Sequence, residues 1–345
     1  MVKMWEEICE QPAALKRCLE TNREVINMLV EALDSHDISS VVIAARGTSD
    51  HAGIYGKYVI ESTLGIPVAL AAPSVVTVYG KSLKLKNSLV IGISQSGKAA
   101  DVLEIIREGN KQGAITVAIT NFNDSPLANE ASYHLYTDAG LEKSVAATKT
   151  FTTQMYLLAN LAAVWAKDAD MQQQLSKVPD LVSKTLELSD VIKEKVQRYR
   201  YMNECFVLAR GMNYSIAMET ALKIQETCYI RARAYAVSDF HHGPFAMIDK
   251  DMPVILLAPE GPSLKDNEEM IHKLKDAGAE LVIFSDKDEI LELGTTSFRI
   301  PKAGSDLLSP FCNAVVAQMF ACNLSLARGL NPDSPRGLNK VTITK

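Results

Sequence analysis

Apolar residues recur along the chain at two different spacings, which separate helices from strands. From Pro12 to about Leu33 they recur every three or four positions, as on one face of a helix, and predict one or two N-terminal helices. Short continuous apolar runs follow, and such runs are typical of strands buried on both faces. In the first half of the chain the predicted strands are residues 39–45, 67–70, 89–93, 115–120 and, shorter, 133–136.

Helical patterns fill the gaps between these strands. Residues 46–49 are predicted as the loop that leaves the first strand, and residues 51–61 and 102–113 as connecting helices. A polar loop then precedes a long helix predicted from about 150 to 167, and the charge-rich stretch 168–200 is also helical in pattern. Alternating strands and helices predict an α/β fold, in which helices cover both faces of a parallel sheet.

The second half of the chain repeats the first. The segment FVLARGMNYSIA in the second half aligns with VIAARGTSDHAG in the first, which places Arg210 on Arg46. The same shift places Gly261 on Gly97, and after one further residue GAELVIFSD aligns with GAITVAITN. Three blocks in one register predict two copies of one α/β unit.

Chain length agrees with two domains, because one hydrophobic core stops growing at about 250–300 residues and this chain has 345. We predict a first domain at residues 1–170, including the N-terminal helices, and a second domain at residues 201–330. Residues 171–200 are predicted as a helical bridge between them, and residues 331–345 as a C-terminal tail.

A polar loop lies between the strand at 89–93 and the helix that follows it. The loop consists of Ser94, Gln95, Ser96 and Gly97. Unpaired N–H groups at the start of a helix attract anions, so serines and a glycine here suit a phosphate. The alternative is an ordinary turn whose serine caps the helix. In the second copy the sequence is Ala258, Pro259 and Glu260, and a carboxylate beside a proline without an N–H is a poor phosphate ligand. A phosphate site is therefore expected in the first copy alone.

Charge and composition restrict the partners. The net charge of −5 disfavours nucleic acid or an anionic membrane as the main partner. The six cysteines include no CxxC pair and are typical of reduced thiols in a cytoplasmic protein. The first residues lack the apolar segment of a signal peptide, and no apolar run reaches the roughly 18 residues of a membrane span.

The second copy carries the residues suited to acid–base chemistry. Lys223 and Glu226 are three positions apart in a helical pattern and share one face, which is also the spacing of an ordinary surface ion pair. His241 and His242 are adjacent after a predicted turn. No Asp, Glu or Cys stands at ligand spacing around them, so no metal or other cofactor is predicted, and proton transfer is the role we favour.

Several motifs in order resemble the double sugar isomerase (SIS) domain family, to which the isomerase half of glucosamine-6-phosphate synthase belongs. The motifs are EICEQP, SQSG, AATKTFTTQ, ALKIQE, YIRARAYA, HHGP and PRGLNKVT. The resemblance covers nearly the whole chain. It implies two tandem SIS domains, each a flavodoxin-like three-layer sandwich, and a homodimer or higher homo-oligomer that takes a small sugar phosphate as substrate.

The resemblance also implies roles for particular residues. Ser94, Gln95, Ser96 and Gly97 would hold the phosphate, while Ser49, Val145 and Ala147 would lie along the sugar. His242, contributed by a neighbouring subunit, would open the sugar ring, and Glu226 would carry a proton between the first and second carbons. Lys223 and Lys340 match lysines at the sugar, the second on a tail that closes over it. The chain departs from the synthase pattern at Lys98, Ala99 and Ala147, where Glu, Thr and Ser are expected.

Four shorter motifs, ARGTSDHA, SVAATKT, QETC and GLNKVTIT, are most similar to the SIS-type glucosamine-6-phosphate deaminases. No cysteine nucleophile follows Met1, so glutamine is not expected to supply nitrogen within this chain. The resulting prediction is conversion of glucosamine 6-phosphate to fructose 6-phosphate and ammonia. Alternatives are a fructosamine-6-phosphate deglycase, an aminotransferase/isomerase without a glutaminase, and a phosphosugar-binding regulator.

Overall fold

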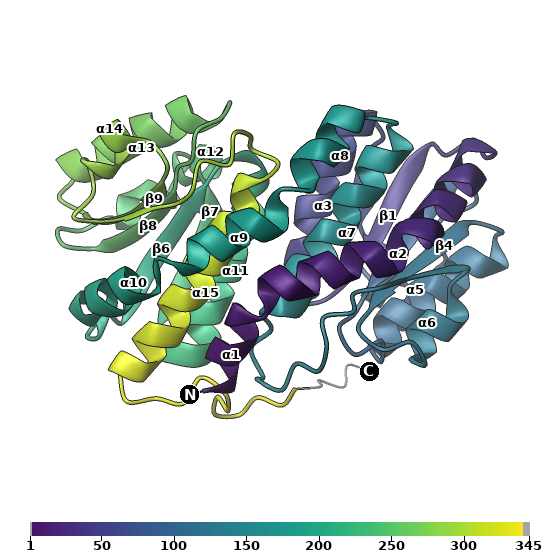
Figure 1. Cartoon of the computed structure of the whole chain (residues 1–345), viewed down its shortest axis with the longest axis horizontal. Coiled ribbons are helices and arrows are strands. Elements are labelled where there is room, and N and C mark those ends of the chain that lie inside the picture. The colour runs from purple at the N-terminus through teal and green to yellow at the C-terminus, as the bar shows by residue number, and fades with distance from the viewer. Residues whose placement is uncertain (1, 341–345) are drawn as a thin grey trace. The chain divides into compact units, whose positions relative to one another are not determined.

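The computed structural model describes residues 2–340, and the chain forms two compact units (Figure 1). Of the described residues, the N-terminal unit comprises Gln11–Glu142, Lys149–Lys177, Asn339 and Lys340. The C-terminal unit comprises Val178–Leu338 together with Lys143–Thr148 and residues 2–10. Two short stretches from the first half of the sequence therefore belong with the second half.

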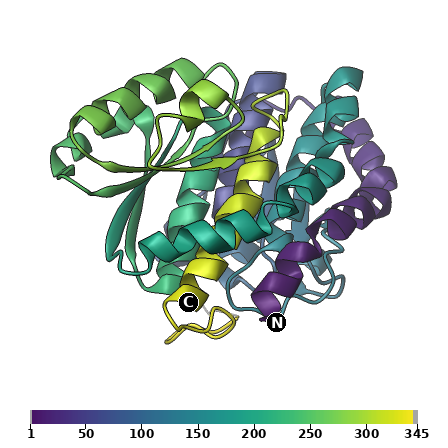
Figure 2. The same ribbon diagram turned by 60° about the vertical axis from the view of Figure 1, so that its left-hand side comes forward.

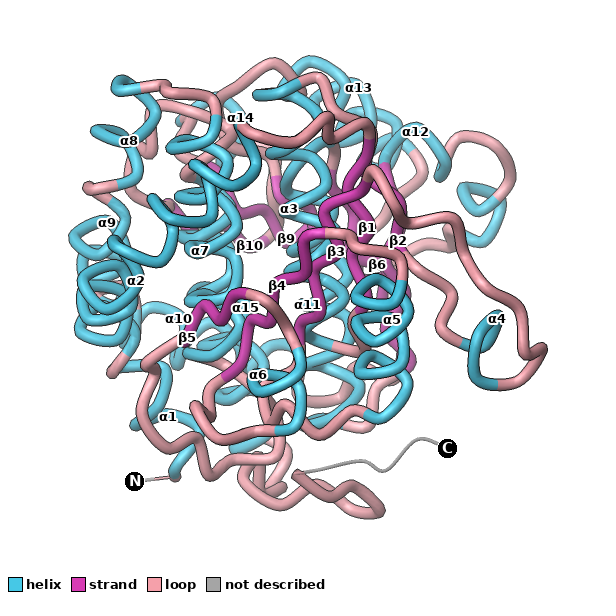
Figure 3. Tube along the Cα trace, turned by 90° about the vertical axis from the view of Figure 1, so that its right-hand side faces the viewer, coloured by secondary structure: helices cyan, strands magenta, loops and turns pink. Residues whose placement is uncertain are grey.

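The N-terminal unit is built on a parallel five-stranded sheet in the order β2-β1-β3-β4-β5, visible edge to edge in Figure 3. The strands are β1 (Ser40–Ala44), β2 (Val68–Leu70), β3 (Ser88–Ile93), β4 (Ile115–Thr120) and β5 (Tyr133–Tyr136). Every residue of β3 and β4 is buried, which explains why these strands are continuous apolar runs.

Helices cover both faces of this sheet. The helices are α2 (Gln11–Asp34), α3 (Thr48–Leu64), α4 (Ser74–Thr77), α5 (Ala100–Lys111), α6 (Pro126–Glu130), α7 (Lys149–Trp165) and α8 (Ala169–Leu175). Helices α2 and α3 pack against α7, whereas α5 packs against α4 and α6. Under α5 lies a core that includes Val90, Ile105, Ile106 and Leu127.

The C-terminal unit has the same strand arrangement. Its strands are β6 (Glu204–Ala209), β7 (Arg231–Ala236), β8 (Pro253–Leu257), β9 (Glu280–Ser285) and β10 (Thr296–Arg299). The order β7-β6-β8-β9-β10 matches β2-β1-β3-β4-β5 strand for strand, and all pairs are parallel. The two sheets confirm the predicted α/β fold of two tandem copies, each with the flavodoxin-like strand order.

Helices also cover both faces of the second sheet, with the green α13 on one side and the yellow α15 on the other in Figure 2. The helices are α1 (Lys3–Cys9), α9 (Val178–Leu186), α10 (Ser189–Lys195), α11 (Tyr214–Cys228), α12 (Val237–Phe240), α13 (Leu264–Asp276), α14 (Asp288–Leu291) and α15 (Ser309–Ala327). Three short 3₁₀ helices are η1 (Val196–Tyr199), η2 (Gly211–Asn213) and η3 (Pro244–Met247).

Helix α15 is buried around its whole circumference, because α1, α9, α10 and α11 pack around it. Among the described helices it is the one whose length and composition would suffice to cross a membrane. Its apolar window is 89% buried inside the protein, as expected of a core helix.

One local prediction is wrong. The pattern predicts that residues 46–49 form the loop after β1, but α3 begins at Thr48, so Ser49 lies in its first turn. Gly47, with φ of +54°, makes the change of direction before the helix. The first apolar residue of the helical pattern comes only at Ala52, which is why the sequence places the helix start too late.

Candidate active site

The loop after β3 forms a tight turn that begins α5. The N–H of Gly97 donates to the carbonyl oxygen of Ser94 at 3.1 Å and lies 3.2 Å from Ser94 Oγ. The N–H of Asn121 donates to the carbonyl oxygen of Gln95 at 3.0 Å, which fixes the loop to the end of β4. Ala99 is the N-cap residue of α5, and no side chain caps that helix. The expectation that a serine of this turn caps the helix is therefore wrong, and the start of the helix is suited to an anion.

Gly97 is required here for two reasons. Its φ of +64° is a left-handed conformation that L side chains rarely adopt. In addition, a Cβ atom at this position would lie 2.1 Å from Oγ and 2.4 Å from Cβ of Ser125, the residue that caps α6. The loop can therefore pack against Ser125 only because position 97 has no side chain.

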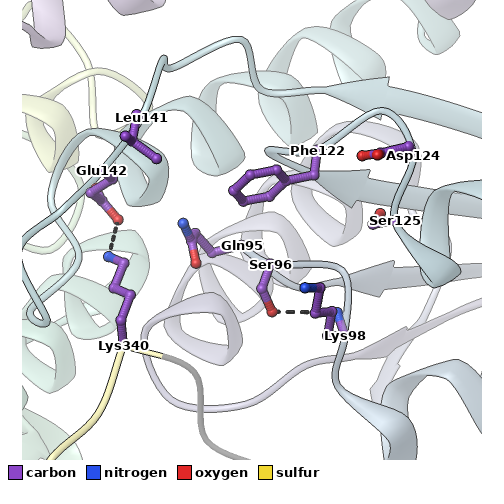
Figure 4. Close-up of a pocket in the computed structure, with 9 residues that line it drawn as sticks. All are labelled: Gln95, Ser96, Lys98, Phe122, Asp124, Ser125, Leu141, Glu142 and Lys340. Carbon is purple, nitrogen blue, oxygen red and sulfur yellow. Dashed lines mark hydrogen bonds and ion pairs between the residues drawn. The ribbon is translucent and has the colours of Figure 1, made fainter.

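A pocket of about 420 Å³ lies beside this loop (Figure 4). Its lining residues are Gln95, Ser96, Lys98, Phe122, Asp124, Ser125, Leu141, Glu142 and Lys340. The pocket thus joins two residues of the predicted phosphate loop with Lys340, which the resemblance placed at the sugar. Ser94 does not line it: Ser94 is buried, and its hydroxyl group lies against the turn.

Ser49 lies at the start of α3, where its N–H donates to the carbonyl oxygen of Arg46 at 3.2 Å. The side chain of Arg46 pairs with Asp101 in the first turn of α5, with 2.7 Å between Nε and Oδ2. Strands β1 and β3 are neighbours, and the order of strands reverses between them. Ligands of such sheets bind at the carboxyl ends of these strands, which is where Ser49 and Ser94 lie.

The carboxylate of Glu142 closes one side of the pocket. Its oxygens accept hydrogen bonds from the N–H of Thr150 at 3.1 Å and from the hydroxyl group of Thr150 at 2.8 Å. Lys340 Nζ lies 2.8 Å from Glu142 Oε2, and Figure 4 shows this ion pair on the far side of Gln95 from Ser96.

In the C-terminal unit, α11 presents a buried lysine between two carboxylates. Lys223 Nζ lies 2.5 Å from Glu226 Oε2 and 3.3 Å from Glu219 Oε1. The side chains of Lys223 and Glu219 are buried, while that of Glu226 is 20% exposed. The predicted pair is therefore not an ordinary surface ion pair. Glu226 is fixed from behind by a buried cation and keeps one side accessible.

Two neighbouring carboxylates keep the side chain of Lys223 charged. Burial alone would lower the pKa of this lysine, but the carboxylates of Glu219 and Glu226 outweigh burial and raise the pKa above its ordinary value of 10.5. At neutral pH the ammonium group is thus present and satisfies both carboxylates.

His242 is exposed in the turn after α12, where its N–H donates to the carbonyl oxygen of Asp239 at 3.0 Å. A hollow of about 290 Å³ there is lined by Val237, Ser238, His241, His242, Asp266 and Glu269. Partial burial, followed by the charges of Lys273 and His242, lowers the pKa of His241. Within residues 2–340, no group of three His, Cys, Asp or Glu side chains is placed to bind a metal ion.

The segment that carries Val145 and Ala147 is fixed from two sides within the C-terminal unit. The buried carboxylate of Glu7 accepts hydrogen bonds from the N–H of Lys143 and from both the N–H and the hydroxyl group of Ser144. The N–H of Val145 donates to the carbonyl oxygen of Asp333 at 3.4 Å.

Asp333 also caps α1. Its carboxylate oxygens accept hydrogen bonds from the N–H groups of Lys3 and Met4, each at 2.8 Å. Asp333 therefore connects the start of α1 to the Val145 segment.

Four of these residues are missing from the sequence-based prediction: Glu7, Glu142, Glu219 and Asp333. Glu219 could have been predicted from the sequence, because it precedes Lys223 by four positions, and residues at this spacing lie on the same face of a helix. Glu7 and Asp333 act on partners that are remote in sequence, and no local pattern indicates such pairs.

The sequence model of the SIS domain matches residues 36–164 and 200–328, and the chain belongs to this family. The glutamine–fructose-6-phosphate aminotransferase (isomerizing) of Thermococcus kodakarensis is 33% identical over 350 residues, which cover 99% of this chain and 58% of the relative. This chain thus spans a little over half the length of that relative.

Solved structures agree on the fold. A phosphosugar isomerase described as putative, from Silicibacter pomeroyi, is 31% identical with a TM-score of 0.87, covering 96% of this chain and all of the other. A glucosamine-6-phosphate deaminase from Thermotoga maritima has a TM-score of 0.79 over 99% of this chain and all of the other. At 21% identity, the second likeness shows the fold alone.

Proposed function

We infer that the chain is an amino-sugar-phosphate isomerase that converts glucosamine 6-phosphate and water to fructose 6-phosphate and ammonia. The observation that carries this proposal is the geometry of Glu226, a partly accessible carboxylate fixed at 2.5 Å by the buried ammonium group of Lys223. Such a group is suited to moving a proton between neighbouring carbons. The SIS family and the pocket beside the Ser94–Gly97 loop support a sugar phosphate as the substrate.

The reaction divides into an isomerisation and a hydrolysis. With the sugar ring open, Glu226 removes the proton from the second carbon. The electron pair forms a double bond to the first carbon while the carbonyl double bond of the first carbon breaks and its oxygen takes up a proton from the solvent, which gives an enolamine. Glu226 then returns its proton to the first carbon; the carbon–carbon double bond breaks as a carbon–nitrogen double bond forms, and the nitrogen releases one proton to the solvent, which leaves an imine on the second carbon. Water adds to this imine and ammonia leaves, which yields fructose 6-phosphate. In this scheme His242 moves the proton needed for ring opening, as the family resemblance implies.

A second candidate is the synthetic direction, in which ammonia from another source adds to fructose 6-phosphate. The observation that favours it is the 33% identity to an isomerizing aminotransferase over 99% of this chain. Both candidates use the same enolamine and the same Glu226. They differ in the nitrogen source and in the direction of net flow.

The experiment is a comparison of substrates with the purified chain. We expect ammonia and fructose 6-phosphate in equal amounts from glucosamine 6-phosphate, and loss of this activity in Glu226→Gln. Glu204→Gln, which changes an exposed carboxylate of the same unit, serves as the matched control and should retain activity. Ammonia-dependent synthesis without release of ammonia would favour the second candidate. Cleavage of a fructosamine 6-phosphate without either reaction would favour a deglycase.

A further inference from the structure

Glu142 is a buried carboxylate that is fixed on one side and faces a pocket on the other. Its side chain has no exposed surface. Thr150, the second residue of the 17-residue helix α7, donates to it through both its N–H and its hydroxyl group. These hydrogen bonds orient the carboxylate before any ligand arrives.

The pocket side of this carboxylate already binds an ammonium group. Lys340 Nζ lies 2.8 Å from Glu142 Oε2, and both residues line the same pocket as Gln95, Ser96 and Lys98 (Figure 4). The pocket therefore has an anion-binding loop on one wall and a carboxylate occupied by an amine on another. An amino-sugar phosphate carries the matching pair of groups, a phosphate and an amine.

We propose that Glu142 recognises the amino group of the substrate, and that Lys340 occupies its place when no substrate is bound. This inference rests on the proposed function. A ligand that displaces Lys340 removes an ammonium group from a buried carboxylate, which is costly unless the ligand brings a cation of its own. Glucosamine 6-phosphate does so, whereas glucose 6-phosphate has a neutral hydroxyl group at that carbon. Glu142 is thus a specificity-determining residue, and the exchange releases the Lys340 side chain.

The competing explanation is that Glu142 only caps α7 and anchors the tail. The two explanations differ in what Glu142→Gln does, because glutamine keeps an acceptor for Thr150 but loses the charge. A structural role predicts equal effects on all ligands. A recognition role predicts that only the amine-bearing ligand is affected.

The test is calorimetric binding near neutral pH with three probes: glucosamine 6-phosphate, glucose 6-phosphate and inorganic phosphate. We expect the unaltered chain to bind glucosamine 6-phosphate roughly 10- to 100-fold more tightly than glucose 6-phosphate, as one charge-assisted hydrogen bond allows. In Glu142→Gln the ratio of the affinities for glucosamine 6-phosphate and glucose 6-phosphate should fall to about 1, and the affinity for inorganic phosphate should stay the same. Lys340→Met should tighten the binding of glucosamine 6-phosphate, because it removes the ammonium group that competes for Glu142. Asp124→Asn removes another carboxylate that lines the pocket and should preserve the ratio.

Each of the following outcomes would overturn the proposal. Equal weakening of the binding of both sugar phosphates in Glu142→Gln would leave only the structural role. Unchanged binding of both in Glu142→Gln, or loss of the ratio in Asp124→Asn, would place amine recognition elsewhere. Equal binding of the two sugar phosphates by the unaltered chain would refute amine recognition alone, whereas binding of neither would refute the proposed function as well. Melting temperatures measured in parallel show whether each variant is folded.

Discussion

Replacing Gly97 with alanine tests the geometry of the Ser94–Gly97 loop, because the structure assigns two separate penalties to this change. The first is conformational: at φ of +64° an L residue costs about 1–2 kcal/mol. The second is steric: the new Cβ would lie 2.1 Å from Ser125 Oγ, and overpacking of this kind costs about 1–3 kcal/mol. We therefore expect Gly97→Ala to lower the free energy of unfolding by about 2–5 kcal/mol.

Gly113 provides the matched control in the same unit. Its φ is +74°, but nothing lies within 4 Å of a Cβ placed there, so Gly113→Ala meets the conformational penalty alone. Urea denaturation gives the loss in free energy of unfolding for each variant, and the difference between the two losses is the steric penalty at Gly97. Calorimetry with inorganic phosphate should show binding lost in Gly97→Ala and retained in Gly113→Ala. Adding Ser125→Gly to Gly97→Ala should recover part of the stability. Equal destabilisation by the two alanines would show that Ser125 does not restrict position 97, and unchanged phosphate binding in Gly97→Ala would show that the loop does not hold the phosphate.

Three further predictions concern the C-terminal unit. Lys223→Met leaves two carboxylates without their buried cation. It should lower the free energy of unfolding at neutral pH by about 3–5 kcal/mol, measured by urea denaturation. Because the pKa of Lys223 is raised in the folded chain, its stabilising effect is complete below pH 10.5 and is lost as the pH rises through the folded-state pKa. The difference in free energy of unfolding between Lys223→Met and the unaltered chain should therefore shrink in strong alkali. Asp333→Ala removes both side-chain acceptors at the start of α1. It keeps the main-chain carbonyl that accepts from Val145 but no longer ties that carbonyl to α1, so the Val145 segment should be held less firmly. We expect the free energy of unfolding to fall by about 1 kcal/mol and KM to rise with kcat little changed, and a fall in kcat alone would contradict a positioning role. If His242 is contributed across a homodimer, inactive Glu226→Gln and inactive His242→Ala should regain activity when refolded together, and mixtures that stay inactive would argue against sharing.

Much of the fold can be predicted from the sequence, because a parallel sheet covered on both faces requires continuous apolar strands. β3 and β4 are entirely buried, and the sequence therefore shows them as short continuous apolar runs. The repeated register also predicts that the two sheets share one strand order. The start of α3 is misplaced because its first turn carries polar residues and its first apolar residue is Ala52, so local periodicity does not mark the start.

The candidate site is predictable only where its residues are neighbours in sequence. The Ser94–Gly97 loop and the pair Lys223 and Glu226 each lie within four positions, and motif or spacing detects them. Glu142 and Lys340 are 198 positions apart, and only tertiary structure brings them together. The clash that fixes Gly97 likewise depends on Ser125, a residue beyond the next strand.

The most direct measurement of the central claim is the release of ammonia from glucosamine 6-phosphate by the purified chain, followed with a glutamate dehydrogenase coupling assay. We predict steady ammonia production matched by fructose 6-phosphate. We also predict that Glu226→Gln loses activity by roughly 100- to 10,000-fold, the usual contribution of a general acid–base group, while still binding the substrate. Ammonia release that persists undiminished in Glu226→Gln, or the absence of both deamination and ammonia-dependent synthesis in the folded unaltered chain, would contradict these predictions.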